Sequence, residues 1–174
     1  ETDIPQYANY TVTISRKLKE LMQVIADSVP FKPNMSTIAT IIKADRGLLP
    51  DYFELMEKAG LIAQLHDSTK GVRGLGKVEK VYLDNTNLSF ALTSETPDIG
   101  NQRETFFFNQ MRVNHTVYNS PISDFLIAGK TFEIGGKKKG QKQITEAEEG
   151  YIVKDDIETG FGNIIPLWTF GMNY

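Results

Sequence analysis

The chain has 174 residues, of which 40% are hydrophobic and 24% charged, and its formal net charge at pH 7 is −3. These values are typical of a globular protein with one medium domain or two small ones. The absence of cysteine excludes disulfides and thiolate-bound zinc. The negative charge argues against a protein that coats nucleic acid without specificity. No apolar run approaches the roughly 20 residues that a membrane-spanning helix needs, so no membrane partner is expected.

The N-terminal segment is polar and begins at Glu1 rather than at a methionine. We therefore expect the chain to be a piece of a longer cytoplasmic polypeptide, with residues 1–14 as a linker. Ser15 is predicted to cap the first helix, because apolar residues then recur at helical spacing as far as Val29. Pro30 ends this pattern.

Two shorter helices are expected next. Asn34 or Ser36 can cap the second helix, and Pro50 fits the first turn of the third, at residues 51–59. Gly60 stands where many helices end in a left-handed residue. The spacing therefore predicts a compact group of three helices in the first third of the chain.

Two apolar segments after the third helix, 61–65 and 78–83, have the composition of strands and are separated by a glycine-rich loop. Three helices followed by a two-stranded ribbon are typical of a winged helix-turn-helix domain, which we place at residues 15–83. The third helix carries mostly acidic side chains, which phosphates repel. The domain is therefore predicted to dock a protein rather than to read a DNA groove with that helix.

The remaining residues, 84–174, are predicted to form a small mixed α/β domain, which makes the chain α+β overall. A short helix capped by Asp84 or Asn85 should precede a longer helix at 101–113. Phe106, Phe107 and Phe108 on the longer helix are expected in the core, with one ring partly exposed. The strands are predicted at 116–119, 124–128, 131–134, 151–153 and 164–170, with a weak helix within 137–149.

The segment from Asp124 to Lys139 is the most informative one, because it predicts a hairpin with a carboxylate on each strand. If Ala128 and Gly129 form the loop, Asp124 falls opposite Glu133, and a one-residue change of loop register moves that pairing by about two positions. Either way, two carboxylates come close together. Magnesium is held in this manner, and metal nucleases use it for phosphoryl displacement.

A third acid, Glu104, lies on the predicted helix before the hairpin. This order of acids resembles the restriction-endonuclease-like fold, in which such acids hold a metal and a lysine two residues after the last one positions or activates the attacking water. Here Gly135 takes the place of that lysine, and Lys137 has the right strand parity but lies one step too far. The resemblance implies a degenerate site with catalytic Glu104, Asp124, Glu133 and Lys137, in which Asp124 and Glu133 are the metal ligands.

Nearly the whole chain, from about Asp3, resembles the C-terminal region of a large family of prokaryotic AAA-type ATPases. In that family a winged helix and a restriction-endonuclease-like domain of unknown function follow the ATPase domain. The segments that carry the resemblance are Leu55–Ile62, Lys80–Asp84 with Asn87 and Leu88, Arg103–Phe107, Ser123–Ile127 and Phe132–Lys137. No Gly-x-x-x-x-Gly-Lys-[Ser/Thr] loop is present, so ATP is expected to bind in the missing domain.

The resemblance implies a recognition or assembly region that does not turn over a substrate by itself. Its expected partners are its own ATPase domain and either another protein or DNA. No cofactor is expected in this fragment, apart from Mg²⁺ if the site is a nuclease. The alternatives are a metal-dependent DNA nuclease and a DNA-binding module that uses the wing and the run from Lys137 to Lys142. The candidate nucleic-acid contacts are Lys43, Arg46, Lys70, Arg73, Lys77, Lys80, Lys138, Lys139 and Lys142.

Overall fold

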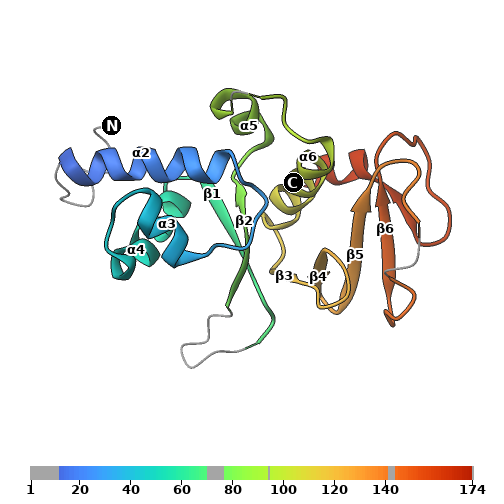
Figure 1. Ribbon diagram of the computed structural model, residues 1–174. Coiled ribbons are helices and arrows are strands. Elements are labelled where there is room, and N and C mark those ends of the chain that lie inside the picture. The colour runs from blue at the N-terminus through green and yellow to red at the C-terminus, as the bar shows by residue number, and fades with distance from the viewer. Residues whose placement is uncertain (1–11, 70–76, 94, 141–143, 174) are drawn as a thin grey trace.

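The computed structural model describes residues 12–69, 77–93, 95–140 and 144–173. Most of the predicted linker, residues 1–11, lies outside this part. In Figure 1 the helices α2, α3 and α4 lie at one end of the molecule and the strands β5 and β6 at the other, with α6 between them. The described residues form an α+β protein, as predicted.

The first helix, α2, spans Val12–Ala26 and so begins three residues before its predicted cap, Ser15. The prediction of that boundary was wrong because Ile14 packs against the helical core and extends the apolar face by part of a turn. The helix α3, Met35–Ile41, is capped by Asn34, whose side chain accepts hydrogen bonds from the amides of Ser36 and Thr37.

A 3-10 turn at Arg46–Leu48 leads into α4, Leu49–Lys58, which has a proline in its first turn. Gly60 follows this helix with a φ of +67°, which confirms its predicted role as the left-handed residue after the helix. The next two elements are the strands β1, Ile62–His66, and β2, Val78–Leu83.

The second half begins with α5, Thr86–Leu92, capped by Asn85, and α6, Ile99–Met111, capped by Asp98. The strands that follow are β3, Val117–Asn119; β4, Phe125–Ile127; β5, Lys130–Gly135; β6, Gly150–Lys154; and β7, Ile164–Pro166. A 3-10 helix, η3, spans Leu167–Met172. The predicted strand at 164–170 was therefore too long, because the chain turns into this helix after Pro166.

One seven-stranded sheet contains strands from both halves, in the order β2-β1-β3-β4-β5-β6-β7. β1 pairs with β3, β5 with β6 and β6 with β7 in parallel, and the other neighbours are antiparallel. The sequence did not predict that the β1-β2 hairpin joins the strands of the second half.

The hairpin of β1 and β2 connects two hydrophobic cores because alternate side chains along a strand point to opposite faces. Ile62 and Val81 belong to the core with α2, α3 and α4. Their neighbours Ala63 and Tyr82 belong to the core with α6 and the later strands. With both faces buried, the hairpin ties the two halves together at the boundary predicted after Leu83.

The second core is built around Phe107 of α6, which is fully buried. Its ring centroid lies 5.3 Å from that of Phe125, 5.4 Å from that of Phe132 and 4.8 Å from that of Phe170. Phe108 is also buried, whereas Phe106 is partly exposed. The prediction of core phenylalanines with one ring partly exposed is confirmed, and this core fixes α6 against the sheet.

The segment 137–149 contains no α-helix among its described residues, 137–140 and 144–149, which form turns instead. The weak helix predicted there was wrong. Ile144 is nonetheless buried, and its Cβ would lie 2.9 Å from a Cβ added at Gly150, so this residue packs down on the start of β6. The helix was predicted from only two apolar residues. In the structure, the packing of Ile144 against the start of β6 determines the conformation of this segment instead.

The β4-β5 hairpin has the predicted two-residue loop. Phe125 pairs with Phe132 and Ile127 with Lys130, a register that places Asp124 opposite Glu133. Ala128 and Gly129 both have positive φ, of 49° and 83°. Two residues of positive φ are what a type I′ hairpin turn requires, and alanine is a poor residue for the first of them.

Ala128→Asn is expected to raise the free energy of unfolding by about 0.5–1 kcal/mol, because asparagine tolerates the left-handed region better than alanine. The measurement is the guanidinium midpoint at constant denaturant slope. Ala59→Asn is the matched control, since Ala59 is also exposed but has a φ of −80°. An unchanged midpoint for Ala128→Asn, or an equal gain in the control, would contradict the assignment of strain to this turn.

Candidate active site

Three carboxylates and two ammonium groups meet where α6, β2 and the β4-β5 hairpin come together. Glu104 comes from α6, Asp124 directly precedes β4, and Glu133 lies in β5. Lys80 of β2 and Lys139, which follows β5, provide the positive charges. The structure thus brings together the three acids that the sequence singled out, together with two lysines that it assigned to nucleic-acid contacts.

Lys80 lies between two of the acids. Its Nζ is 3.1 Å from Oε2 of Glu104 and 3.9 Å from Oδ1 of Asp124. Tyr82, two residues further along β2, donates its hydroxyl to the same Glu104 oxygen at 3.0 Å. Burial, followed by the negative charge of Glu104, raises the pKa of Tyr82 well above its ordinary value, so the phenol remains a donor.

Asp124 is held in an unfavourable charged environment. Its side chain is 16% exposed, and its Oδ2 accepts a hydrogen bond of 2.8 Å from the Ile134 amide. Burial and then the charge of Glu104 raise the pKa of Asp124 to about 6, with a further contribution from Glu133. The Ile134 hydrogen bond and Lys80 act in the opposite direction but do not cancel these effects.

Glu133 is the most deeply buried acid of the site, with only 1% of its side chain exposed. The ammonium of Lys139 lies against its Oε1, and the hydroxyl of Ser123 donates to its Oε2. Oε1 accepts no hydrogen bond of regular geometry from any described residue, so the Lys139 charge is what compensates it. A buried charge without such a partner would be costly to the fold.

Gly135 explains how Lys139 reaches Glu133. A Cβ built on Gly135 would lie 2.7 Å from both Cγ and Cδ of Lys139 and 2.8 Å from its Cβ, closer than such atoms approach in proteins. The missing side chain at residue 135 therefore leaves the space in which the stem of Lys139 folds back over the end of β5. Gly135 occupies the position at which the nuclease pattern has a lysine, and it leaves room for the side chain of Lys139 instead.

Lys137, the predicted catalytic lysine, is exposed. It forms no ion pair with a described residue, and its carbonyl oxygen accepts a hydrogen bond of 3.3 Å from Lys154 Nζ. The parity argument assumed that the strand continues, but β5 ends at Gly135 and a turn follows. The structure therefore brings Lys139, and not Lys137, to the carboxylates.

The candidate nucleic-acid contacts fall into three groups. Two of them, Lys80 and Lys139, belong to the carboxylate cluster. Lys70, Arg73 and Lys142 lie outside the described residues. The exposed members of the set are Lys43, Arg46, Lys77 and Lys138. Among the described wing residues, Lys77 also lies 3.6 Å from Glu79, so its charge is partly compensated.

The donor chemistry of the cluster suits a hard divalent cation, since its acidic ligands are all oxygens. As the side chains lie, no three acidic or imidazole groups of the described residues converge closely enough to hold one ion. Glu104 and Asp124 already share one cation, the Lys80 ammonium, and magnesium is commonly bound by one or two carboxylates with water. Glu104 and Asp124 therefore already share one cation position, and the predicted ligand pair, Asp124 and Glu133, stays a prediction.

Sequence reasoning missed the roles of Tyr82 and Ser123 and placed Lys80 and Lys139 elsewhere. For Tyr82 and Lys80 a signal was available, because residues 80 and 82 share a strand face opposite to the buried Val81. For Ser123 there was none, because it lies in a bend before β4, where no strand period indicates the direction of a side chain. Its Oγ also lies 3.1 Å from the Phe132 carbonyl oxygen, which is an alternative acceptor for the one hydroxyl hydrogen.

No protein-family model matches this sequence, and no curated protein or solved structure is significantly similar to it. Within the described residues, no helix is both long enough and apolar enough to cross a membrane.

Proposed function

We propose that this chain carries a metal-dependent nuclease site in the C-terminal region of a AAA-type ATPase. The observation that carries the proposal is the position of Lys139 in the space left by Gly135, with its ammonium on Glu133. Lys139 would thereby replace the lysine that the sequence pattern has two residues after Glu133. Glu104, Asp124, Glu133 and Lys139 would then supply the acids and the lysine that such a site needs.

The order of the elements also supports this proposal. α6 with Glu104 is followed by three strands paired antiparallel, which carry Asp124 and Glu133 in the order that the resemblance gives for its acids, and by β6 parallel to β5. The three helices before the β1-β2 hairpin support a winged helix-turn-helix domain in the first half. Lys80 and Tyr82 come from this hairpin, so both halves would contribute to one site.

In this proposal Glu104 and Asp124 would hold the metal, and the Lys80 ammonium would contact a phosphate. A bound Mg²⁺ would stabilise charge on the phosphoryl oxygens and lower the pKa of a bound water. Lys139 orients the attacking water and offsets negative charge near Glu133, while Tyr82 and Ser123 fix the two glutamates through their hydroxyls.

Cleavage of supercoiled plasmid in the presence of Mg²⁺ or Mn²⁺ tests the proposal. We expect the chain to nick or linearise the plasmid, and Asp124→Ala and Glu104→Gln to reduce the rate by about 100-fold or more, because each removes a metal ligand. Glu148→Ala, which alters an exposed acid, is the control and should retain full activity. Absence of cleavage with both metals, or cleavage that survives Asp124→Ala, would rule out a nuclease at this site.

The position of Lys80 favours a second candidate function. Its ammonium already lies between Glu104 and Asp124, the two acids that would hold a metal. If it holds the two acids permanently, the cluster is structural, and the chain is a recognition or assembly region for its ATPase domain without turnover. Titration calorimetry with Mn²⁺ distinguishes the two candidates, since a structural cluster gives no binding heat that depends on Asp124.

A further inference from the structure

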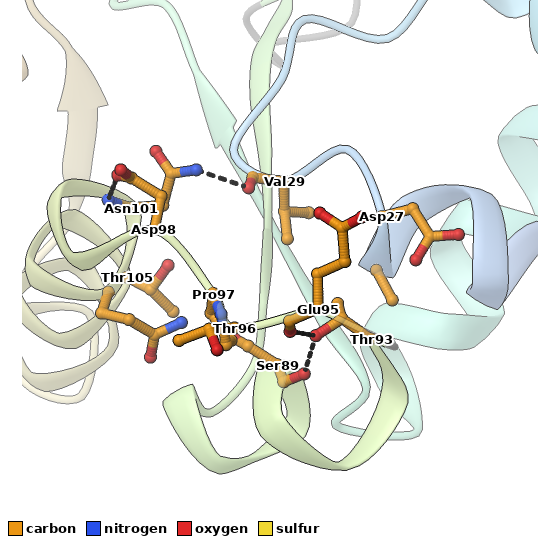
Figure 2. Close-up of a pocket in the computed structure, with 12 residues that line it drawn as sticks. Asp27, Val29, Ser89, Thr93, Glu95, Thr96, Pro97, Asp98, Asn101 and Thr105 are labelled. Carbon is orange, nitrogen blue, oxygen red and sulfur yellow. Dashed lines mark hydrogen bonds between the residues drawn. The ribbon is translucent and has the colours of Figure 1, made fainter.

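A cavity of about 490 Å³ lies where the end of α2, α5 and the start of α6 meet (Figure 2). It is lined by side chains from all three helices and from the loop between α5 and α6. Its volume falls within the range typical of small-molecule sites.

The cavity wall is strongly acidic. Asp27, Glu95 and Asp98 contribute three carboxylates, and no lysine, arginine or histidine is among the lining residues. The start of α6 adds only a partial positive charge of about 0.5, and Asp98, its capping residue, already accepts a hydrogen bond of 2.9 Å from the Asn101 amide. The cavity therefore has a net negative charge.

The negative charge of the Glu95 carboxylate is not compensated by any described residue. This carboxylate forms no ion pair and no hydrogen bond with a described residue, whereas Asp27 accepts hydrogen bonds of 3.0 and 3.1 Å from the amide of Gln23. An amide is neutral, so it orients Asp27 without cancelling its charge. Both acids remain available to a positively charged ligand.

Two buried hydroxyls provide a second, independent indication of a ligand. Ser89 is 4% exposed and Thr105 is 2% exposed, and both line the cavity. Neither hydroxyl forms a hydrogen bond with a described residue, and neither oxygen is among the fully buried unpartnered atoms of the described residues, so the accessible part of each side chain opens onto the cavity. Figure 2 shows Thr105 on the α6 side of the cavity and Glu95 across from it, on the loop after α5. A ligand with several donors could therefore reach both.

We propose that this cavity binds an organic cation of the guanidinium or ammonium type. The charged group would bind Glu95 and Asp27 and donate to the Thr105 hydroxyl, while Ala26, Val29 and Pro97 pack against its alkyl part. A guanidinium presents several donors in a plane, which suits a wall of carboxylates and hydroxyls. Because the walls come from α2 and from α6, the bound cation stabilises the arrangement of the two halves.

Two sources can supply this chemistry, a free alkylguanidine and an arginine side chain of another polypeptide. Calorimetric titration of the whole chain with agmatine and with N-acetylarginine amide distinguishes them. Tighter binding of agmatine indicates a free small cation, and tighter binding of the amide indicates an arginine residue of a polypeptide. Citrulline amide, which has a similar shape but no charge, is expected to bind at least tenfold more weakly than either.

Glu95→Gln should weaken binding of the cation at least tenfold, because it removes the uncompensated charge while keeping the shape of the side chain. Thr105→Val should weaken it severalfold, and circular dichroism checks that this buried substitution leaves the fold intact. Glu148→Gln is the matched control and should bind like the unaltered chain. The proposal is overturned if neither cation binds, if citrulline amide binds equally well, or if Glu95→Gln has no effect.

Discussion

Asp124→Asn is expected to make the protein more stable than the unaltered chain at pH 7.5, by about 2–3 kcal/mol in the free energy of unfolding. The folded structure holds the Asp124 carboxylate in a buried place near Glu104 and Glu133, which raises its pKa from 3.8 to about 6. Each unit of such a shift corresponds to about 1.4 kcal/mol. A neutral amide removes this cost, and its oxygen can still accept the hydrogen bond from the Ile134 amide.

The pH dependence follows from the direction of the shift. Between about pH 4 and pH 6 the folded chain holds a proton on Asp124 that the unfolded chain has lost, so stability from this group falls as the pH rises. Below about pH 4 both states are protonated and the cost disappears. The gain from Asp124→Asn should therefore be small near pH 4, grow up to about pH 6 and remain constant above it.

Urea unfolding at a series of pH values measures this gain. Glu148→Gln serves as the control, because it neutralises an exposed acid outside the cluster and should change stability little at any pH. A variant that is no more stable at pH 7.5, or one whose gain is the same at pH 4, would show that Asp124 is not strained electrostatically. Mg²⁺ should stabilise the unaltered chain more than the variant, since the ion removes the same repulsion.

Local sequence signals predicted most of the elements that position the site. Asn34, Asn85 and Gly60 mark helix ends through their own side chain or backbone freedom, and the structure uses each of them in that way. Ala128 and Gly129 fixed the loop and hence the pairing of the two strands. These features could be predicted because each depends on a few neighbouring residues.

The junction of the two halves could not be predicted in the same way. β1 meets β3 through the pair His66 and Tyr118, which are far apart in the chain. The run of apolar residues in β2 shows that both of its faces are buried, but it does not say which elements cover them. Only the fold reveals that Val81 faces the helices while Tyr82 faces α6 and the site.

Lys139→Met is expected to reduce metal-dependent plasmid cleavage by about 100-fold or more, while Lys137→Met leaves it nearly unchanged. The two lysines are separated by one residue in the same basic run, yet only Lys139 contacts Glu133. If the site works as proposed, cleavage requires the ammonium group at Glu133. A rate loss of about 100-fold is typical of removing one charged donor from an active site. Cleavage that depends on Lys137 instead would favour the assignment made from strand parity.

A relocated lysine provides the more decisive test. Lys139→Met also leaves Glu133 buried without its partner, which alone can destabilise the fold by about 3–5 kcal/mol. In the double variant Gly135→Lys with Lys139→Gly, the ammonium returns to the place that the restriction-endonuclease-like pattern gives it, and both the Cβ and the stem of Lys139 that would contact it are gone. We expect this variant to cleave within about tenfold of the unaltered chain, whereas Lys139→Gly alone should not.

Gly135→Ala is a further test, because it removes no charged group from the chain. The added methyl group would lie 2.7 Å from the stem of Lys139, so the lysine must leave Glu133. Cleavage should then fall as it does in Lys139→Met, although the catalytic groups are all present. If instead Gly135→Ala cleaves normally, the glycine has no part in placing the lysine, and the match between this site and a nuclease loses its main support.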